Sequence, residues 1–214
     1  MTTAHCCGAE KIFDYKNAQK ELKKYLKKGP GKSTKRLINS LSNYDKSNKS
    51  LLDVGSGVGS IMWDFLENGG SNTTDVDAST AYLETAKKYA QQQNWEDRVT
   101  FQQGDLTDTI NNGQVFDFVT MDKVICCYPD YQLLLQKAMK QCKDVLAITF
   151  PIGGPLAHFF NSFTHLYLII QKNPFRTYIH PFKEIEKLIV ENGFEIKSKQ
   201  ISFPWRIWVF ERHS

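Results

Sequence analysis

Residues 51–59 read Leu51-Leu52-Asp53-Val54-Gly55-Ser56-Gly57-Val58-Gly59, an apolar run that ends in an acid and passes into three alternating glycines. Apolar residues resume at Ile61, so the pattern predicts a buried strand, a tight turn and the start of a helix. Glycine has no Cβ atom, so this turn can adopt positive φ and let a ligand lie against the backbone. The helix that follows offers unpaired N–H groups in its first turn.

Two classes of cofactor bind at a turn of this kind. The dinucleotide fingerprint is G-x-G-x-x-G, and the position that would complete it here is Ser60. A carboxylate at Asp53 would repel a pyrophosphate, whereas it suits a cationic ligand. The segment resembles motif I of the class I S-adenosylmethionine-dependent methyltransferases, whose cofactor carries an α-amino group and a sulfonium.

The composition is that of one folded domain. The chain has 214 residues, of which 41% are apolar and 13% aromatic, and this excludes a disordered protein. No apolar run reaches the ~18 residues of a membrane span, and the first residues lack the features of a secretory signal. Five cysteines, an odd number, fit free thiols in a reducing cytoplasm.

Basic residues are concentrated before the first strand. Residues 11–50 carry eleven lysines and one arginine against three acids, a local charge of +9 in a protein of net charge +4. This pattern fits an arm that binds nucleic acid, anionic lipid or an anionic substrate, and it fits a solvated helix face equally well. Gly31-Lys32-Ser33 is similar to the end of a P-loop, but Leu26 stands where that loop needs glycine.

Strands and helices are predicted to alternate along the chain. The predicted strands are 49–54, 72–77, 99–101, 116–121, 145–150, 194–202 and 205–211. The predicted helices are 10–28, one capped by Ser33-Thr34, 58–68, one capped by Ser79, 130–141, a helix-like run over 156–171, and 181–192. This order predicts an α/β fold: a Rossmann-like seven-stranded sheet, mostly parallel with a terminal antiparallel hairpin, as in the methyltransferases that motif I resembles. An N-terminal helical arm precedes the sheet.

The resemblance implies a cofactor role for residues at the carboxyl ends of the strands. Asp53 and the glycine turn would hold the methionine end of S-adenosylmethionine, and Thr34 would contact its carboxylate. Asp77 would bind the ribose hydroxyls, with Asp75 as the alternative. Asp105 would accept from the adenine amino group. The residues assigned to the cofactor are Thr34, Asp53, Gly55, Ser56, Gly57, Gly59, Asp77, Ala78, Asp105, Leu106 and Met121.

A closer likeness is to a bacterial branch of small methyltransferases grouped with magnesium-protoporphyrin O-methyltransferase. The shared segments are Lys27-Lys28-Gly29-Pro30-Gly31-Lys32-Ser33-Thr34 and Val124-Ile125-Cys126-Cys127-Tyr128-Pro129. The porphyrin enzyme carries histidine where this chain has Cys127. We therefore carry over neither the porphyrin acceptor nor the mechanism of that enzyme.

The predicted function is methyl transfer from S-adenosylmethionine to a small, apolar or anionic molecule in the cytoplasm. Tyr25, Cys127 and Tyr128 are the residues expected to orient or deprotonate the acceptor. The chain lacks the Asn/Asp-Pro-Pro-Tyr/Phe motif of nucleic-acid amino methyltransferases, so nucleic acid is a minority hypothesis. The alternatives are a nicotinamide-dependent oxidoreductase and a non-catalytic module that binds S-adenosylmethionine.

The chain divides into an N-terminal helical lid, 1–48, and a methyltransferase domain, 49–214, which contains a substrate-side insertion at 151–177. The run 156–171 is apolar nearly all round and holds no acid. Such a segment covers an apolar substrate, belongs to the core or lies peripherally in a membrane interface, and it is too short to span a bilayer.

The cysteines form two adjacent pairs, Cys6-Cys7 and Cys126-Cys127, besides Cys142. One hypothesis is a thiol cluster that binds a soft ion or closes a redox switch. The other is a buried Cys126 in the core and an exposed N-terminal pair. The sequence contains no spacing that predicts a metal site.

Overall fold

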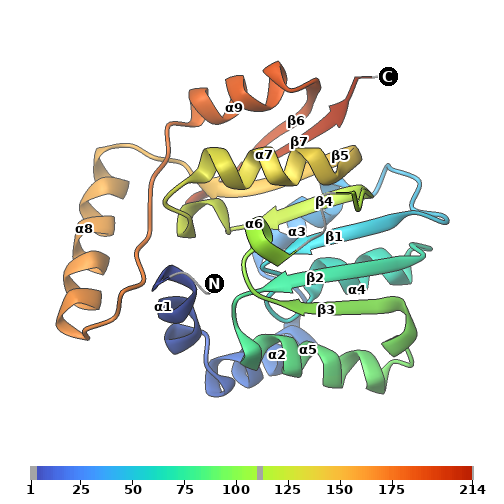
Figure 1. Ribbon diagram of the computed structural model, residues 1–214, viewed down its shortest axis with the longest axis horizontal. Helices are drawn as coiled ribbons and strands as arrows, with labels where there is room; N and C mark the ends of the chain where they lie inside the picture. Colours follow the sequence, from blue (N-terminus) through green and yellow to red (C-terminus); the bar gives the residue numbers. More distant parts are fainter. Residues whose placement is uncertain (1–3, 110–112, 214) are drawn as a thin grey trace.

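The computed structural model describes residues 4–109 and 113–213, which form a seven-stranded sheet between two layers of helices (Figure 1). The strands are β1 (Ser50–Val54), β2 (Asn72–Asp77), β3 (Val99–Gln103), β4 (Phe116–Asp122), β5 (Cys142–Pro151), β6 (Phe194–Ser202) and β7 (Trp205–Arg212). Their order in the sheet is β3-β2-β1-β4-β5-β7-β6, and only the pairs that include β7 are antiparallel. The predicted α/β fold, with its mostly parallel sheet and antiparallel terminal hairpin, is confirmed.

Helices cover both faces of the sheet because each helix has one apolar side. One face carries α3 (Lys32–Ser40), α4 (Ser60–Glu67) and α5 (Thr80–Gln92), which bury Leu37 and Trp63 completely. The other face carries α6 (Leu106–Thr109), α7 (Tyr131–Gln141) and α9 (Phe182–Glu191), which bury Leu134 and Ile185. Short 3₁₀ turns, η1 (Glu96–Arg98) and η2 (Ile125–Cys127), precede β3 and follow β4.

The predicted helix over 10–28 is interrupted, and that prediction was wrong in this respect. Its residues belong to α1 (Ala4–Ile12) and α2 (Tyr15–Lys28). Asp14 caps α2 by accepting a hydrogen bond from the backbone N–H of Asn17 at 2.8 Å. The carbonyl of Phe13 accepts from the Ser79 hydroxyl at 2.6 Å. This turn therefore fixes the arm to the N-terminus of α5.

The start of α3 also differs from the prediction. Its N-cap is Gly31, so Ser33 and Thr34 lie inside the first turn and do not cap the helix. The Thr34 hydroxyl instead donates a hydrogen bond to Asp122. Leu37 and Ile38 on the same helix are buried in the core, so this part of the predicted lid belongs to the main packing unit.

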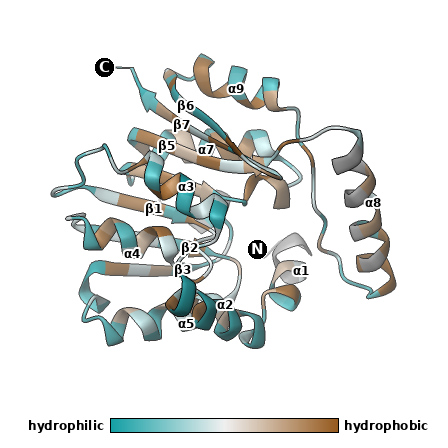
Figure 2. Cartoon of the chain, turned by 180° about the vertical axis from the view of Figure 1, so that it is seen from behind, coloured by the Kyte–Doolittle hydropathy of each residue, from teal (hydrophilic) through white to brown (hydrophobic). Residues whose placement is uncertain are grey.

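The insertion forms α8 (Pro155–Ile170), which stands away from the sheet and runs alongside the returning segment 171–181 (Figure 1). Leu168 is buried against Ala9 and Phe175, which joins the insertion to α1. Seen from behind in Figure 2, α8 lies at the outer edge of the molecule. None of the helices in the described ranges is both long and apolar enough to cross a membrane.

The strand order reverses between β1 and β4, whose neighbours lie in opposite directions along the sheet. In open α/β sheets, ligands bind beyond the carboxyl ends of the strands at such a point. Figure 1 shows α1 and α8 on this side of the sheet, where the parallel strands end. The fold thus places the glycine turn after β1 under the N-terminal arm and the insertion.

Candidate functional site

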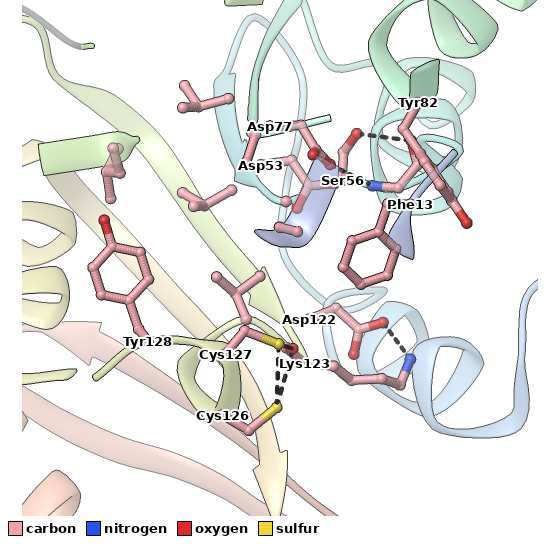
Figure 3. Close-up of a pocket in the computed structure, with 18 of the residues that line it drawn as sticks. Phe13, Asp53, Ser56, Asp77, Tyr82, Asp122, Lys123, Cys126, Cys127 and Tyr128 are labelled. Carbon is pink, nitrogen blue, oxygen red and sulfur yellow. Dashed lines mark hydrogen bonds and ion pairs between the residues drawn. The ribbon is translucent and has the colours of Figure 1, made fainter. Parts of the chain in front are cut away.

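A cavity of about 480 Å³ lies at the carboxyl ends of β1, β2 and β4. This volume is within the ~300–1,000 Å³ of small-molecule sites. Nine residues predicted to bind the cofactor line it: Thr34, Asp53, Gly55, Ser56, Gly57, Asp77, Ala78, Asp105 and Leu106. Figure 3 shows several of these side chains with those that follow β4.

Two predicted cofactor residues lie outside the cavity lining. Met121 is fully buried in the core between the sheet and α7. Gly59 is the N-cap of α4 with φ of 82°, and a Cβ atom there would come within 2.5 Å of the Trp63 ring. Trp63 also donates from Nε1 to the carbonyl of Val58 at 2.7 Å. Gly59 therefore allows the turn to pack on the core helix.

The other two glycines of the turn border the cavity. Gly55 and Gly57 have φ of 64° and 60°, values that residues with a Cβ atom rarely adopt. A Cβ atom on Gly55 would also lie 2.7 Å from Cγ2 of Val124. The turn thus brings backbone close to the cavity in a way that only glycine permits.

Asp53, at the end of β1, has a buried carboxyl group of which one oxygen is hydrogen-bonded to a described residue and the other is not. Its Oδ1 accepts from the Thr120 hydroxyl at 2.6 Å. Its Oδ2 has no hydrogen-bond partner among the described residues. Burial, opposed in part by the Thr120 hydrogen bond, raises the pKa of Asp53 to about 8. A cationic donor from a ligand would satisfy this oxygen and favour the ionised form.

The two acids on β2 have different surroundings. Asp77 lines the cavity, and it accepts from the backbone N–H of Ser79 at 2.8 Å and of Gly57 at 3.4 Å. Asp75 is fully buried behind the turn and accepts from the Ser56 hydroxyl at 2.7 Å. Burial raises the pKa of both carboxyl groups. Of the two, only Asp77 faces the space where a ligand would lie.

Charge in the cavity is strongly unbalanced. Five carboxyl groups line it, on Glu21, Asp53, Asp77, Asp105 and Asp122, against one ammonium on Lys123. Burial raises the pKa of two of these groups, Asp53 and Asp77, and a cationic ligand group beside them would favour their ionised forms. The residues present therefore fit the α-amino group and the sulfonium of the expected S-adenosyl cofactor.

Three polar side chains meet where β4 ends. The Thr34 hydroxyl donates to Oδ2 of Asp122 at 2.6 Å, and Lys123 Nζ lies 2.8 Å from both groups. Lys123 has φ of 66°, which is unfavourable for a residue with a side chain. Backbone strain of this kind is common at functional sites. Sequence reasoning found Thr34 but missed Asp122 and Lys123, which have no distinctive local pattern.

The turn after β4 carries the predicted catalytic residues Cys127 and Tyr128, and both line the cavity. The Sγ atoms of Cys126 and Cys127 lie 3.9 Å apart. A hydrogen bond from Cys126 lowers the pKa of Cys127, and the same contact, together with burial, raises the pKa of Cys126. Cys127 is therefore the sulfur atom more readily ionised.

His180 holds this turn in place, and sequence reasoning missed it. Its Nε2 lies 3.1 Å from the carbonyl of Ile125 and 2.9 Å from that of Tyr128. Two acceptors on one nitrogen require that Nε2 carries a proton and donates. Burial lowers the pKa of His180, so the neutral imidazole is favoured.

Tyr25, the third predicted catalytic residue, lies elsewhere. It borders a second cavity of about 510 Å³ between α2 and the turn at Gly29–Gly31. Its ring packs edge to face on Tyr89 with centroids 6.3 Å apart. Burial raises the pKa of Tyr25 to about 12, which makes it a poor base near neutral pH.

Aromatic side chains close the first cavity from the side of the arm. The ring of Phe13 packs edge to face on Tyr82 at 5.8 Å and on Phe175 at 6.0 Å between centroids. The Tyr82 hydroxyl donates to Glu21 on α2 at 2.8 Å. Phe175 comes from the insertion, and no local sequence signal indicated that it meets Phe13. The side chains of Cys6 and Cys7 lie outside the described part of the structure.

Comparison with known proteins adds sequence and structural evidence. Residues 45–150 match the profile of a family described as a methyltransferase domain. None of the curated proteins compared is similar enough in sequence to count as a relative.

Solved structures with the same fold include magnesium protoporphyrin IX methyltransferase from Synechocystis PCC 6803 with bound S-adenosylhomocysteine. The TM-score is 0.74 at 18% identity, over 96% of this chain and 98% of that one. A putative sarcosine dimethylglycine methyltransferase from Galdieria sulphuraria has a TM-score of 0.66 at 15% identity, over 83% and 84%. An O-methyltransferase family protein from Burkholderia thailandensis has 0.66 at 15%, over 85% and 56%.

Proposed function

The chain carries a methyltransferase domain with the class I S-adenosylmethionine-dependent fold, and from this premise we propose that it methylates a small apolar or anionic molecule. The observation that carries the proposal is the cavity itself. Its wall combines a glycine turn, a buried carboxyl oxygen without a partner and an excess of acids, all of which suit a cationic methyl donor.

The cofactor would lie along the carboxyl ends of β1, β2 and β3. Asp53 and the backbone at Gly55 and Gly57 would hold its methionine end, and Asp77 would accept from the ribose hydroxyls. The adenine would lie beside Ala78, Asp105 and Leu106, as the resemblance implies. When bound, the cofactor supplies an electrophilic methyl group on a sulfonium. The protein's contribution is to hold the acceptor in line with that group and to exclude water.

The acceptor would occupy the remaining part of the cavity, between the turn after β4 and the insertion. Lys123, which already pairs with Asp122, carries the one ammonium among the described lining residues, and its remaining donor would receive an anionic group. Trp205 and Phe175 supply apolar wall on this side. Cys127 and Tyr128 are the lining residues that would orient or deprotonate the acceptor. Because Tyr25 borders the second cavity, its proposed role is confined to closing the arm over the cofactor.

The lid would consist of α1 and α2, since α3 is part of the core. Residues 151–177 would decide which acceptor enters, because Phe175 and Thr177 line the acceptor side. The odd number of cysteines in the sequence supports a reducing compartment such as the cytoplasm.

The outer side of α8 would contact a membrane surface peripherally. Phe163, Leu166 and Ile170 lie at helical spacing and are 57%, 55% and 68% exposed. No acid occurs between Asp144 and Glu184, so anionic lipid would not be repelled from this segment. The opposite side of α8 packs on Phe175, which places the exposed stripe and the acceptor side of the cavity on two sides of one helix.

The proposed function can be tested with methyl-labelled S-adenosylmethionine and cell extract separated into small molecules, nucleic acid and protein. We expect label in the small-molecule fraction. Lys123→Ala should lower that transfer at least tenfold while S-adenosylhomocysteine still binds. Label confined to macromolecules would overturn the acceptor class. Cofactor binding without transfer to any fraction would indicate a sensing module.

A further inference from the structure

The adjacent thiols of Cys126 and Cys127 point in one direction, which is unusual for consecutive residues. In a strand, neighbouring side chains diverge to opposite faces. Here the two residues lie in the 3₁₀ turn η2, and their Sγ atoms are 3.9 Å apart. Both sulfur atoms also approach the carbonyl of Lys123, at 3.2 Å and 3.6 Å (Figure 3). The turn therefore presents two thiols side by side.

This arrangement is poorly suited to a disulfide. A disulfide requires an S–S bond of ~2.0 Å and normally joins residues whose Cα atoms are ~4.4–6.8 Å apart. Consecutive Cα atoms across a trans peptide are ~3.8 Å apart. Oxidation would have to distort the turn that His180 holds through two backbone carbonyls. The geometry thus favours two free thiols over a disulfide.

The separation does match two sulfur ligands on one soft atom. Two thiolates at the ~2.3 Å Zn–S distance and a tetrahedral angle are about 3.8 Å apart, and the smaller angle at a pyramidal trivalent atom requires the two sulfur atoms to move slightly closer. However, the described residues contain no group of three or more His, Cys, Asp or Glu side chains that could complete a metal centre. The bound atom must therefore need only two ligands from the protein. A trivalent metalloid that already carries one organic substituent meets this requirement.

We infer that Cys126 and Cys127 form a dithiol site for trivalent arsenicals and related soft thiophiles on the wall of the cavity. Soft thiolate ligands select soft ions of this kind. Cys127 is half-buried and lines the cavity, so a small reagent reaches it from there. The depressed pKa of Cys127 supports the attack of its thiolate. Cys126, which is only 6% exposed, then closes the chelate from behind.

The reaction with an organic arsenic(III) oxide balances without any change of oxidation state. Each thiol forms one sulfur–arsenic bond, the arsenic–oxygen bonds break, and the two thiol protons leave with the oxygen as one water molecule. The second bond forms within the complex, where the effective concentration of the neighbouring thiol gives a ~10²–10⁴-fold gain. A single cysteine lacks this gain. Tight retention of the arsenical therefore distinguishes the proposed dithiol site from an ordinary reactive cysteine.

Phenylarsine oxide is the probe, and intact mass spectrometry of the reduced full-length protein is the readout. The matched background is Cys6→Ser/Cys7→Ser, which removes the other adjacent pair. We expect this variant to take up one phenylarsine per chain. A dithiol such as 2,3-dimercaptopropanol should remove it, whereas an equal concentration of a monothiol should not. The additional change Cys126→Ser or Cys127→Ser should weaken retention by at least 100-fold, and Cys142→Ala should leave it unchanged.

Two results would overturn the site. One is an adduct that persists in the background carrying Cys126→Ser/Cys127→Ser. The other is an adduct that disappears in Cys6→Ser/Cys7→Ser alone, which would assign the chelate to the N-terminal pair. Binding of S-adenosylhomocysteine to each variant, measured by its melting shift, shows that the cavity is still folded. The readout does not depend on turnover, so its failure leaves the proposed methyl transfer untouched.

Discussion

The aromatic rings of Phe13 and Phe175 pack edge to face, with their centroids 6.0 Å apart. This contact joins the turn between α1 and α2 to the segment that follows α8, and both residues line the cavity. Residues of the predicted lid and of the insertion therefore meet at the wall of the cavity.

Phe13→Ala should weaken S-adenosylhomocysteine binding about tenfold, because an aromatic pair and its buried area contribute roughly 1–2 kcal/mol. Calorimetric titration measures the change. The control is Phe163→Ala, which removes an exposed ring from α8 and should leave affinity unchanged. Equal affinity of wild type and Phe13→Ala would show that the lid does not close over the cofactor.

Asp77→Ala should weaken cofactor binding by roughly 1–3 kcal/mol, the cost of leaving buried hydroxyl groups without an acceptor. Asp77→Asn keeps an acceptor for the N–H of Ser79 and tests the charge with less disturbance of the turn. If both variants bind normally while Asp75→Asn binds weakly, the ribose ligand is Asp75.

The pKa of Asp53, about 8, predicts proton release when the cofactor binds. A cationic group beside the carboxyl lowers its pKa, so at pH 7 a proton leaves, and affinity should rise with pH until about 8. Titrations of S-adenosylhomocysteine in two buffers of different ionisation enthalpy measure the release. In Asp53→Asn the release attributable to this group should vanish. Identical proton release in wild type and Asp53→Asn would contradict this role.

His180 should stabilise the turn that carries the two cysteines. Because burial lowers its folded pKa, the stabilisation is complete above the unfolded value of ~6.5 and is lost as pH falls through the folded pKa. His180→Ala should lower the free energy of unfolding by about 1–3 kcal/mol at pH 8. Below pH 6.5, the free energy of unfolding should fall less steeply with pH in this variant than in the wild type. Denaturant unfolding at several pH values tests this. Unchanged stability in His180→Ala would mean that its two hydrogen bonds contribute nothing net.

The exposed stripe on α8 should bind anionic vesicles. Phe163→Ser/Ile170→Ser should lower co-sedimentation with phosphatidylglycerol vesicles about tenfold or more, since each buried apolar side chain contributes ~1.5–3 kcal/mol. Val190→Ser, on the exposed side of α9, is the matched control. Equal sedimentation of all three proteins would rule out membrane contact through α8.

Much of the fold follows from local pattern, because several strands, such as β1, β4 and β5, contain apolar runs that end near a turn residue. The range 72–77 and the cap at Ser79 match β2 and the start of α5. The break at Phe13 was missed because its ring continues the helical apolar spacing, while its contacts with Tyr82 and Phe175 are made far along the chain.

That most residues assigned to the cofactor line one cavity was predictable, since they follow strands whose ends must meet at one edge. The acceptor side was not. Lys123 contacts Thr34 on α3, and His180 contacts the backbone of the turn η2, and neither pair has a fixed spacing in the sequence. Tyr25 was predicted to contact the acceptor, but it lies on α2 and faces the second cavity.

Calorimetric titration of the purified protein with S-adenosylhomocysteine and, separately, with NAD tests the central claim most directly. The unpaired oxygen of Asp53 suits the α-amino group of the former ligand, whereas the described lining offers the pyrophosphate of the latter a single ammonium, on Lys123. We expect one S-adenosylhomocysteine to bind per chain and NAD to produce no binding heat. Binding of NAD without binding of S-adenosylhomocysteine would contradict the methyltransferase assignment of this site.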